Sequence, residues 1–158
     1  METANSAAKT VLKAARSLFA AFKTDPELEK NGVVLLYSGL RLTVARAGGA
    51  NTAFGKLLNA RLKPYERQMQ QKTMDNDVAD DIVRKTYADA IIKFSEVELE
   101  DGTFIEGCTN EAGDVLPFTP ANVEAMFVAL PDLFRDVQSQ AQLMTVYRAE
   151  DIQDTIKN

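Results

Sequence analysis

The spacing of apolar residues changes near Asn51, and this change limits the folds open to the chain. Before it, apolar and polar or small residues alternate over 40–45 behind a Ser38-Gly39 turn signal. This pattern predicts a β-hairpin over 33–44 with one buried face. After it, apolar residues follow the spacing of amphipathic helices through most of the chain. The sequence therefore predicts a largely helical protein that contains a short sheet.

Capping and breaking residues divide the helical part into segments. Pro64 should kink the helix that starts at Asn51, because proline lacks an N–H and its ring clashes with the preceding turn. Asn51 and Thr119 are expected to be N-caps, and Asp101-Gly102 predicts a second hairpin. The expected helices cover 6–22, 51–72, 75–94, 120–130, 131–146 and a short polar stretch over 151–157.

These segments predict a fold class of mainly α (α+β). We expect a small helical domain of about five or six helices with one or two short β-hairpins. A length of 158 residues fits a single domain spanning 1–158. Within it, an N-terminal amphipathic helix over 1–24, a candidate assembly arm, precedes a core over 31–158.

Composition argues against most familiar catalytic chemistries. The chain has no histidine, which removes histidine-based triads, general bases and metal ligands, and its single cysteine, Cys108, has no activating base. The carboxylate clusters near Asp80 and Glu98 are interpreted as helix caps and solvated faces. Gly48-Gly49 is interpreted as a turn rather than an anion site. We therefore expect no enzymatic activity, no metal and no cofactor; an enzyme using carboxylates and a divalent metal is the alternative.

The net charge of −5 argues against nucleic-acid binding, and no apolar stretch approaches the roughly 20 residues that span a membrane. We therefore expect neither nucleic acid nor membrane as a partner. The candidate partner-binding residues are Leu12, Phe19 and Phe22, which lie on the apolar stripe of the N-terminal helix. This stripe contacts either another protein or the chain's own core, because periodicity does not say which surface a stripe meets.

Three sequence strings occur in an order that is typical of one family of phage proteins. Each string places a turn or an aromatic residue next to a helix. They are Arg46, Gly48, Gly49 and Asn51 followed by Lys63, Pro64 and Tyr65; Tyr87, Ala88 and Phe94; and Phe118, Thr119 and Asn122 followed by Leu130 to Phe134. With these strings the chain resembles the tail assembly chaperone family of long-tailed (siphovirus-type) bacteriophages over about 33–158.

The resemblance implies a non-enzymatic protein of the host cell cytoplasm that is absent from the mature virion. Its implied partners are the tape-measure protein, the tail tube protein that it helps to recruit, and further copies of itself. A small acidic domain with apolar stripes is compatible with this role, because amphipathic helices are captured in apolar grooves. The alternative is a minor structural tail protein or head-completion protein of the virion.

Overall fold

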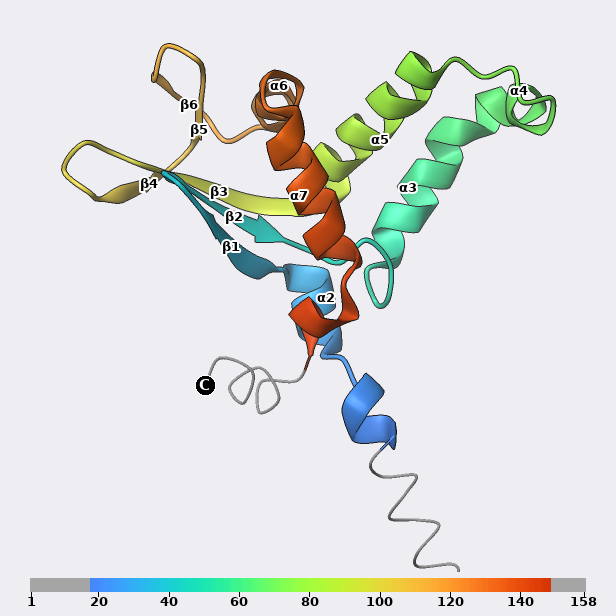
Figure 1. The fold of residues 1–158 in the computed structure, drawn as a ribbon, viewed down its shortest axis with the longest axis horizontal. Helices are drawn as coiled ribbons and strands as arrows, with labels where there is room; N and C mark the ends of the chain where they lie inside the picture. The colour runs from blue at the N-terminus through green and yellow to red at the C-terminus, as the bar shows by residue number, and fades with distance from the viewer. Residues whose placement is uncertain (1–17, 149–158) are drawn as a thin grey trace, which may run out of the picture.

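The computed structural model describes residues 18–148, and its strands form two antiparallel sheets (Figure 1). The larger sheet has four strands in the order β1-β2-β3-β4, and the smaller one pairs β5 with β6. The strands are β1 (Val33–Tyr37), β2 (Leu40–Val44), β3 (Ile92–Glu98), β4 (Phe104–Glu106), β5 (Cys108–Thr109) and β6 (Val115–Leu116).

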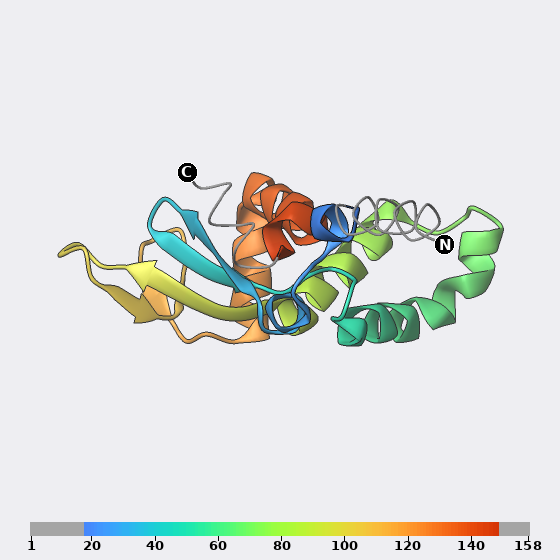
Figure 2. The ribbon, with the colours of Figure 1, turned by 90° about the horizontal axis from the view of Figure 1, so that it is seen from below.

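The labelled helices precede, separate and follow these strands, and residues 18–22 are also helical. The helices are α2 (Pro26–Asn31), α3 (Thr52–Leu62), α4 (Glu66–Gln70), α5 (Asn76–Ala90), α6 (Pro120–Ala129) and α7 (Pro131–Gln142), with 3-10 turns over Lys63–Tyr65 and Met144–Tyr147. Figure 2 shows an elongated shape, with the large sheet at one end and the hairpin formed by α3, α4 and α5 at the other.

The predicted first hairpin is confirmed. β1 and β2 pair from Val33 opposite Val44 to Tyr37 opposite Leu40, and Ser38-Gly39 forms the turn between them. Gly39 has a φ of 77°, a backbone conformation that glycine adopts without steric cost. The alternating apolar side chains of β2 are buried as the pattern requires. They belong to a core that is completed by Ile91, just after α5, and by side chains of α5, α6 and α7, which are Tyr87, Ala88, Val123, Met126, Phe127, Val137 and Ala141.

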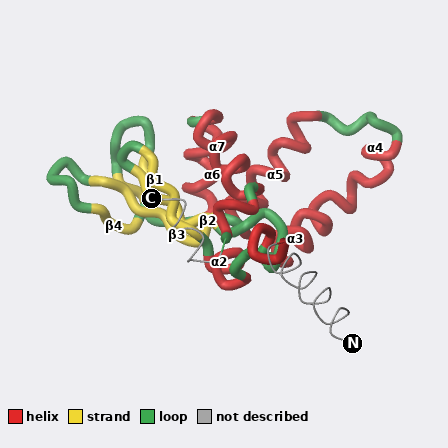
Figure 3. Tube along the Cα trace, turned by 60° about the horizontal axis from the view of Figure 1, so that its bottom comes forward, coloured by secondary structure: helices red, strands yellow, loops and turns green. Residues whose placement is uncertain are grey.

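The predicted fold class of a small, mainly helical domain with one or two short hairpins is wrong. The protein is an α+β domain whose four-stranded sheet is a principal element (Figure 3). The helix expected over 75–94 ends at Ala90, and β3 begins at Ile92. The side chains of Ile91 and Phe94 continue the helical spacing, which is why the sequence favoured a longer helix. β3 forms instead because it pairs with both β2 and β4, and these ladders outweigh the local pattern.

The break in the helix near Pro64 is confirmed. α3 ends at Leu62, a 3-10 turn contains Pro64, and α4 continues from Glu66. The N-cap at Thr119 is also confirmed, because its Oγ1 accepts a hydrogen bond from the backbone N–H of Asn122 at 3.2 Å. The hairpin at Asp101-Gly102 is confirmed by the pairing of β3 with β4.

The expected capping role of Asn51 is wrong. The residue precedes α3, but its side chain makes no capping hydrogen bond to that helix. Its Nδ2 donates to the carbonyl oxygens of Arg46 at 2.9 Å and Ala90 at 3.2 Å. Asn51 therefore joins the loop before α3 to the end of α5. The helix α2 was not expected; Asp25 caps it, with Oδ1 accepting from the N–H of Glu27 at 2.9 Å.

Two predictions concern residues outside the described range. The helix over 151–157 lies wholly outside it, as does most of the helix over 6–22, including Leu12. In the part of the chain that is described, no helix is long and apolar enough to cross a membrane.

Candidate partner-binding groove

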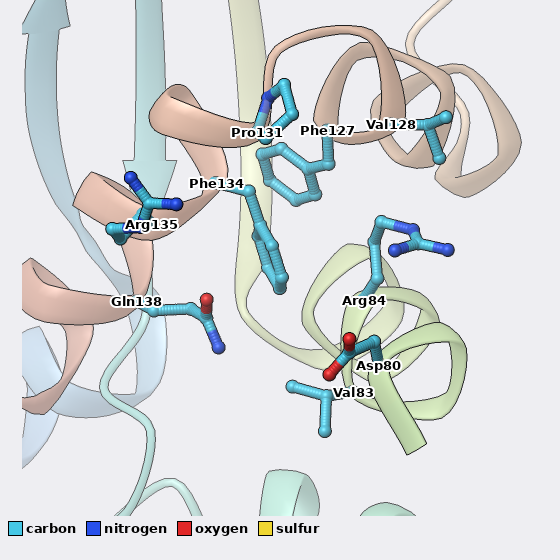
Figure 4. A pocket seen from close by; sticks show the side chains of 9 residues that line it. All are labelled: Asp80, Val83, Arg84, Phe127, Val128, Pro131, Phe134, Arg135 and Gln138. Atoms are coloured by element: carbon cyan, nitrogen blue, oxygen red, sulfur yellow. The ribbon is translucent and has the colours of Figure 1, made fainter. Parts of the chain in front are cut away.

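A cleft of about 360 Å³ opens where α5 faces α7 and the end of α6. Figure 4 shows its lining side chains, which come from all three helices. We call it the α5–α7 groove; it is lined by Asp80, Val83 and Arg84 of α5, Phe127 and Val128 of α6, and Pro131, Phe134, Arg135 and Gln138 of α7.

The floor of the α5–α7 groove is aromatic and tightly held. Pro131 starts α7 directly after α6, and this sharp turn brings Phe127 and Phe134 together with ring centroids 4.8 Å apart. Phe134 also meets Tyr87 edge to face at 5.4 Å, which suits the ring quadrupoles. Because Phe127 and Tyr87 are buried, they fix the position of the half-buried Phe134. The floor is therefore an apolar surface formed in advance of any ligand.

The rim of the α5–α7 groove carries both signs of charge. Arg84 Nη2 lies 3.3 Å from Asp81 Oδ1, and Arg135 Nη1 lies 2.7 Å from Asp132 Oδ1. The second pair is solvent-exposed, so it contributes little to stability. The Nε of Arg84 is buried and has no hydrogen-bond partner among residues 18–148. A buried donor without a partner carries a free-energy cost.

The α5–α7 groove combines an apolar floor with polar and charged side chains. Its polar lining residues are Asp80, Arg84, Arg135 and Gln138. Within residues 18–148 no three histidine, cysteine, aspartate or glutamate side chains lie together as a metal site requires. Cys108 lies elsewhere, in the core, where burial raises the pKa of its thiol.

The candidate residues Phe19 and Phe22 lie away from the groove. They lie just after Leu18, the first described residue. Phe19 is 73% exposed, Phe22 is 65% exposed and Leu18 is 59% exposed. The three side chains group on one side of the short helix over 18–22. They make no part of the buried core, so the structure leaves them available for contact; Leu12 lies outside the described residues.

Sequence reasoning missed the groove residues because it assigned Phe127 and Phe134 to ordinary buried stripes. One signal could have found the site. The segment over 120–130 is apolar on nearly every side of its helix, so some apolar residues must face outward. Val128 is 56% exposed and Leu130 51% exposed in the structure.

The Gly48-Gly49 loop has a structural role, as expected. Arg46, just before this loop, places Nη1 2.6 Å from Oε2 of Glu29. Glu29 is 3% exposed and also accepts from Thr24 Oγ1 at 3.0 Å. Gly49 has a φ of 54°, and any Cβ there would overlap the Glu29 carboxylate. The glycine is therefore required by this close approach.

The protein is an α+β domain with an open groove, lined by apolar and charged side chains, between α5, α6 and α7. A family model described as YdaY prophage protein matches residues 49–158, which include α3 to α7 and every residue of the groove. Because the match covers more than half of the chain, this protein belongs to the YdaY prophage protein family. No curated protein and no solved structure matches the chain. The expected bacteriophage origin is confirmed, and a role in tail assembly stays a prediction.

Proposed function

We propose that this prophage protein is a tail assembly chaperone that holds amphipathic helical segments of the tape-measure protein in the α5–α7 groove. The observation that carries the proposal is the groove itself, with its fixed aromatic floor and charged rim on a phage protein. The resemblance to tail assembly chaperones, described from the sequence, is the reason for assigning the bound helix to the tape-measure protein. The role is non-enzymatic and belongs to the host cell cytoplasm.

The geometry supports capture of one face of a helix at a time. A cleft of about 360 Å³ has room for a few side chains, so the contact with any one turn is small and reversible. A chaperone must release its client when tail tube protein arrives, and weak contacts repeated along the client satisfy this requirement.

The exposed N-terminal aromatic residues support a second contact. Phe19 and Phe22 are too exposed to stabilise the described core, and aromatic side chains are enriched where proteins meet. We propose that they contact the same tape-measure protein or a further copy of this chain. Two modest contacts on one client give an avidity that neither supplies alone.

Light scattering of the full chain, alone and mixed with a tape-measure fragment from the same prophage, tests the proposal. We expect a complex whose mass contains several copies of the chain for each fragment. A mixture in which both proteins keep their separate masses at tens of micromolar would overturn the proposal, since even weak groove binding, with a Kd near about 10 μM, would be visible there.

The alternative is a minor structural tail or head-completion protein, for which the same apolar surfaces would form permanent contacts. Mass spectrometry of purified particles separates the two roles. We expect the chain in lysates of induced cells and not in finished particles. Its presence in particles at a fixed copy number would favour the structural role.

A further inference from the structure

The outer edge of β1 is open. β1 is the first strand of the sheet and pairs with β2 on one side only, and no strand within residues 18–148 pairs with its other side. The two-residue turn makes Tyr37 and Leu40 a hydrogen-bonded pair, so bonding to β2 continues at alternate residues. The N–H and C=O groups of Val34 and Leu36 therefore point outward from the sheet.

The side chains of β1 leave this edge unprotected. The strand reads Val-Val-Leu-Leu-Tyr and contains no charge and no proline, the residues that normally prevent strands from pairing between molecules. Val34 is 53% exposed and Leu36 is 74% exposed, both on the face of the sheet away from the core. The opposite edge differs: β4 has three residues and ends in the exposed Glu106.

An identical strand fits this edge in one symmetric arrangement. If two β1 strands run antiparallel about a two-fold axis at Leu35, Val34 lies opposite Leu36 of the partner subunit. The outward-pointing N–H and C=O groups of Val34 and Leu36 then form hydrogen bonds with the other copy, and the two-fold axis repeats these bonds. Arg41 lies opposite Leu36 within one copy and Thr43 lies opposite Val34. The joined face therefore places four apolar side chains in the middle with no like charges opposed.

We propose that β1 is the interface between two copies of this chain, which join their larger sheets into one continuous antiparallel sheet. The occupant of the edge is a second copy because the strand is uncharged and self-complementary in register. This pairing needs no tape-measure protein and would stand if the proposed function failed. It also leaves the α5–α7 groove of each copy unused, because the groove residues lie on other elements.

Sedimentation equilibrium of the full chain across a concentration series tests the interface. We expect a monomer–dimer equilibrium that Leu36→Lys weakens by about a hundredfold, because the symmetric contact loses Leu36 twice and each lost leucine accounts for roughly tenfold. Val115→Lys is the matched control, since Val115 is 43% exposed on β6, and it should dimerise as the wild type does. A wild-type chain that stays monomeric, or a dimer that Leu36→Lys leaves intact, would overturn the proposal.

Salt and register supply two further tests. Because each copy carries a net charge of −5, raising salt from about 0.05 M to about 0.5 M should leave the dimer unchanged or tighten it. Marked weakening by salt would indicate an interface of ion pairs and contradict a β1 contact.

Mild oxidation of Leu35→Cys should give a covalent dimer, since Leu35 lies opposite Leu35 of the partner subunit across the axis. Thr43→Cys, on the interior strand, should not give one. Cross-linking by Thr43→Cys alone would contradict this register.

Failure of this proposal and failure of the proposed function are distinguishable. Leu36→Lys should weaken the dimer by the same hundredfold and keep tape-measure binding in the groove. Val128→Lys, in the groove, should keep the dimer. A variant at β1 that loses tape-measure binding but keeps the dimer, while its circular dichroism spectrum is unchanged, would place the client on the strand edge and contradict the self-pairing.

Discussion

At the scale of single residues, Glu29 and Arg46 show how the loop before α3 is fixed. The Glu29 side chain is buried, and its carboxylate receives hydrogen bonds from Arg46 and Thr24. The backbone N–H of Arg46 also donates to the carbonyl of Glu29 at 2.9 Å. This ion pair therefore joins α2 to the loop between β2 and α3. Removing one partner of such a pair leaves the other charge unpaired and partly desolvated, which destabilises the folded protein.

Gly49→Ala should destabilise the protein strongly because the new Cβ would displace the Glu29 carboxylate. We expect the free energy of unfolding to fall by about 3 kcal/mol, combining backbone strain with the damaged ion pair. Gly113→Ala is the control: Gly113 also has a positive φ, 83°, but has open space around it. It should lose only about 1 kcal/mol, the cost of the backbone conformation. Equal losses in urea denaturation would contradict the role given to Gly49.

Tyr147 holds the end of the described chain to the sheet. Its buried hydroxyl donates to the carbonyl oxygen of Val44 at 2.9 Å. Tyr147→Phe should therefore lower the free energy of unfolding by about 1 kcal/mol. Tyr65→Phe should change it by less than about 0.5 kcal/mol, because the Tyr65 hydroxyl has no partner within residues 18–148. A Tyr147→Phe variant as stable as the wild type would contradict this anchor.

The burial of Tyr147 also affects how the free energy of unfolding depends on pH. Burial raises the pKa of Tyr147 above its ordinary value of 10.0, and it does the same for Tyr87 and Tyr37. Above pH 10 the unfolded chain releases these protons while the folded chain keeps them. The contribution of these tyrosines to the free energy of unfolding should therefore be constant well below this pH and fall as the pH rises above it. Urea titrations between about pH 8 and pH 11 test this, and the fall should be shallower for Tyr147→Phe.

At the scale of elements, the junction of α5 with β3 determines the fold class. Asn51 donates to the carbonyl of Ala90, the last residue of α5, and so secures the point where the helix stops. The backbone N–H of Ala45 donates to Ile91 O at 2.8 Å just beyond it. These contacts come from segments far away in the sequence. No local pattern around Ile91 could have predicted them.

Asn51→Asp separates the observed role of this residue from an ordinary N-cap. Asparagine and aspartate are equally good N-caps, so a capping residue would tolerate the change. At Asn51 the carboxylate would instead face two carbonyl oxygens in a buried position, and we expect a loss of about 3 kcal/mol. Thr119→Asp, at a true N-cap, should be nearly neutral. An Asn51→Asp protein of wild-type stability in thermal or urea unfolding would contradict the account.

The elements that the sequence predicted are those with local causes. The Ser38-Gly39 turn, the break at Pro64 and the Thr119 cap each depend on the conformation of one or two residues. The missed elements have distant causes. β3 forms because it pairs with β2. The groove forms because the turn at Pro131 places Phe134 against Phe127 and Tyr87. A stripe of apolar residues shows that a helix is buried, but not which neighbours bury it.

At the scale of the whole molecule, the surfaces assigned to partners are separate. The α5–α7 groove lies among the helices, the open strand edge lies at β1, and the exposed aromatic residues lie near the described start of the chain (Figures 1 and 4). One copy can therefore hold a client helix, pair with a second copy and present Phe19 and Phe22 at the same time. Such an arrangement suits a protein that must cover a long client with many weak contacts.

The most direct test of the central claim is calorimetric titration of the full chain with a helical segment of the tape-measure protein, comparing Val128→Lys with Val115→Lys. Both substitutions add the same charge to an exposed valine, but only Val128 lines the α5–α7 groove. We predict that Val128→Lys loses at least about tenfold in affinity and that Val115→Lys binds as the wild type does. Equal affinities for the two variants, or no binding by the wild-type chain, would contradict the assignment of this groove to the tape-measure protein.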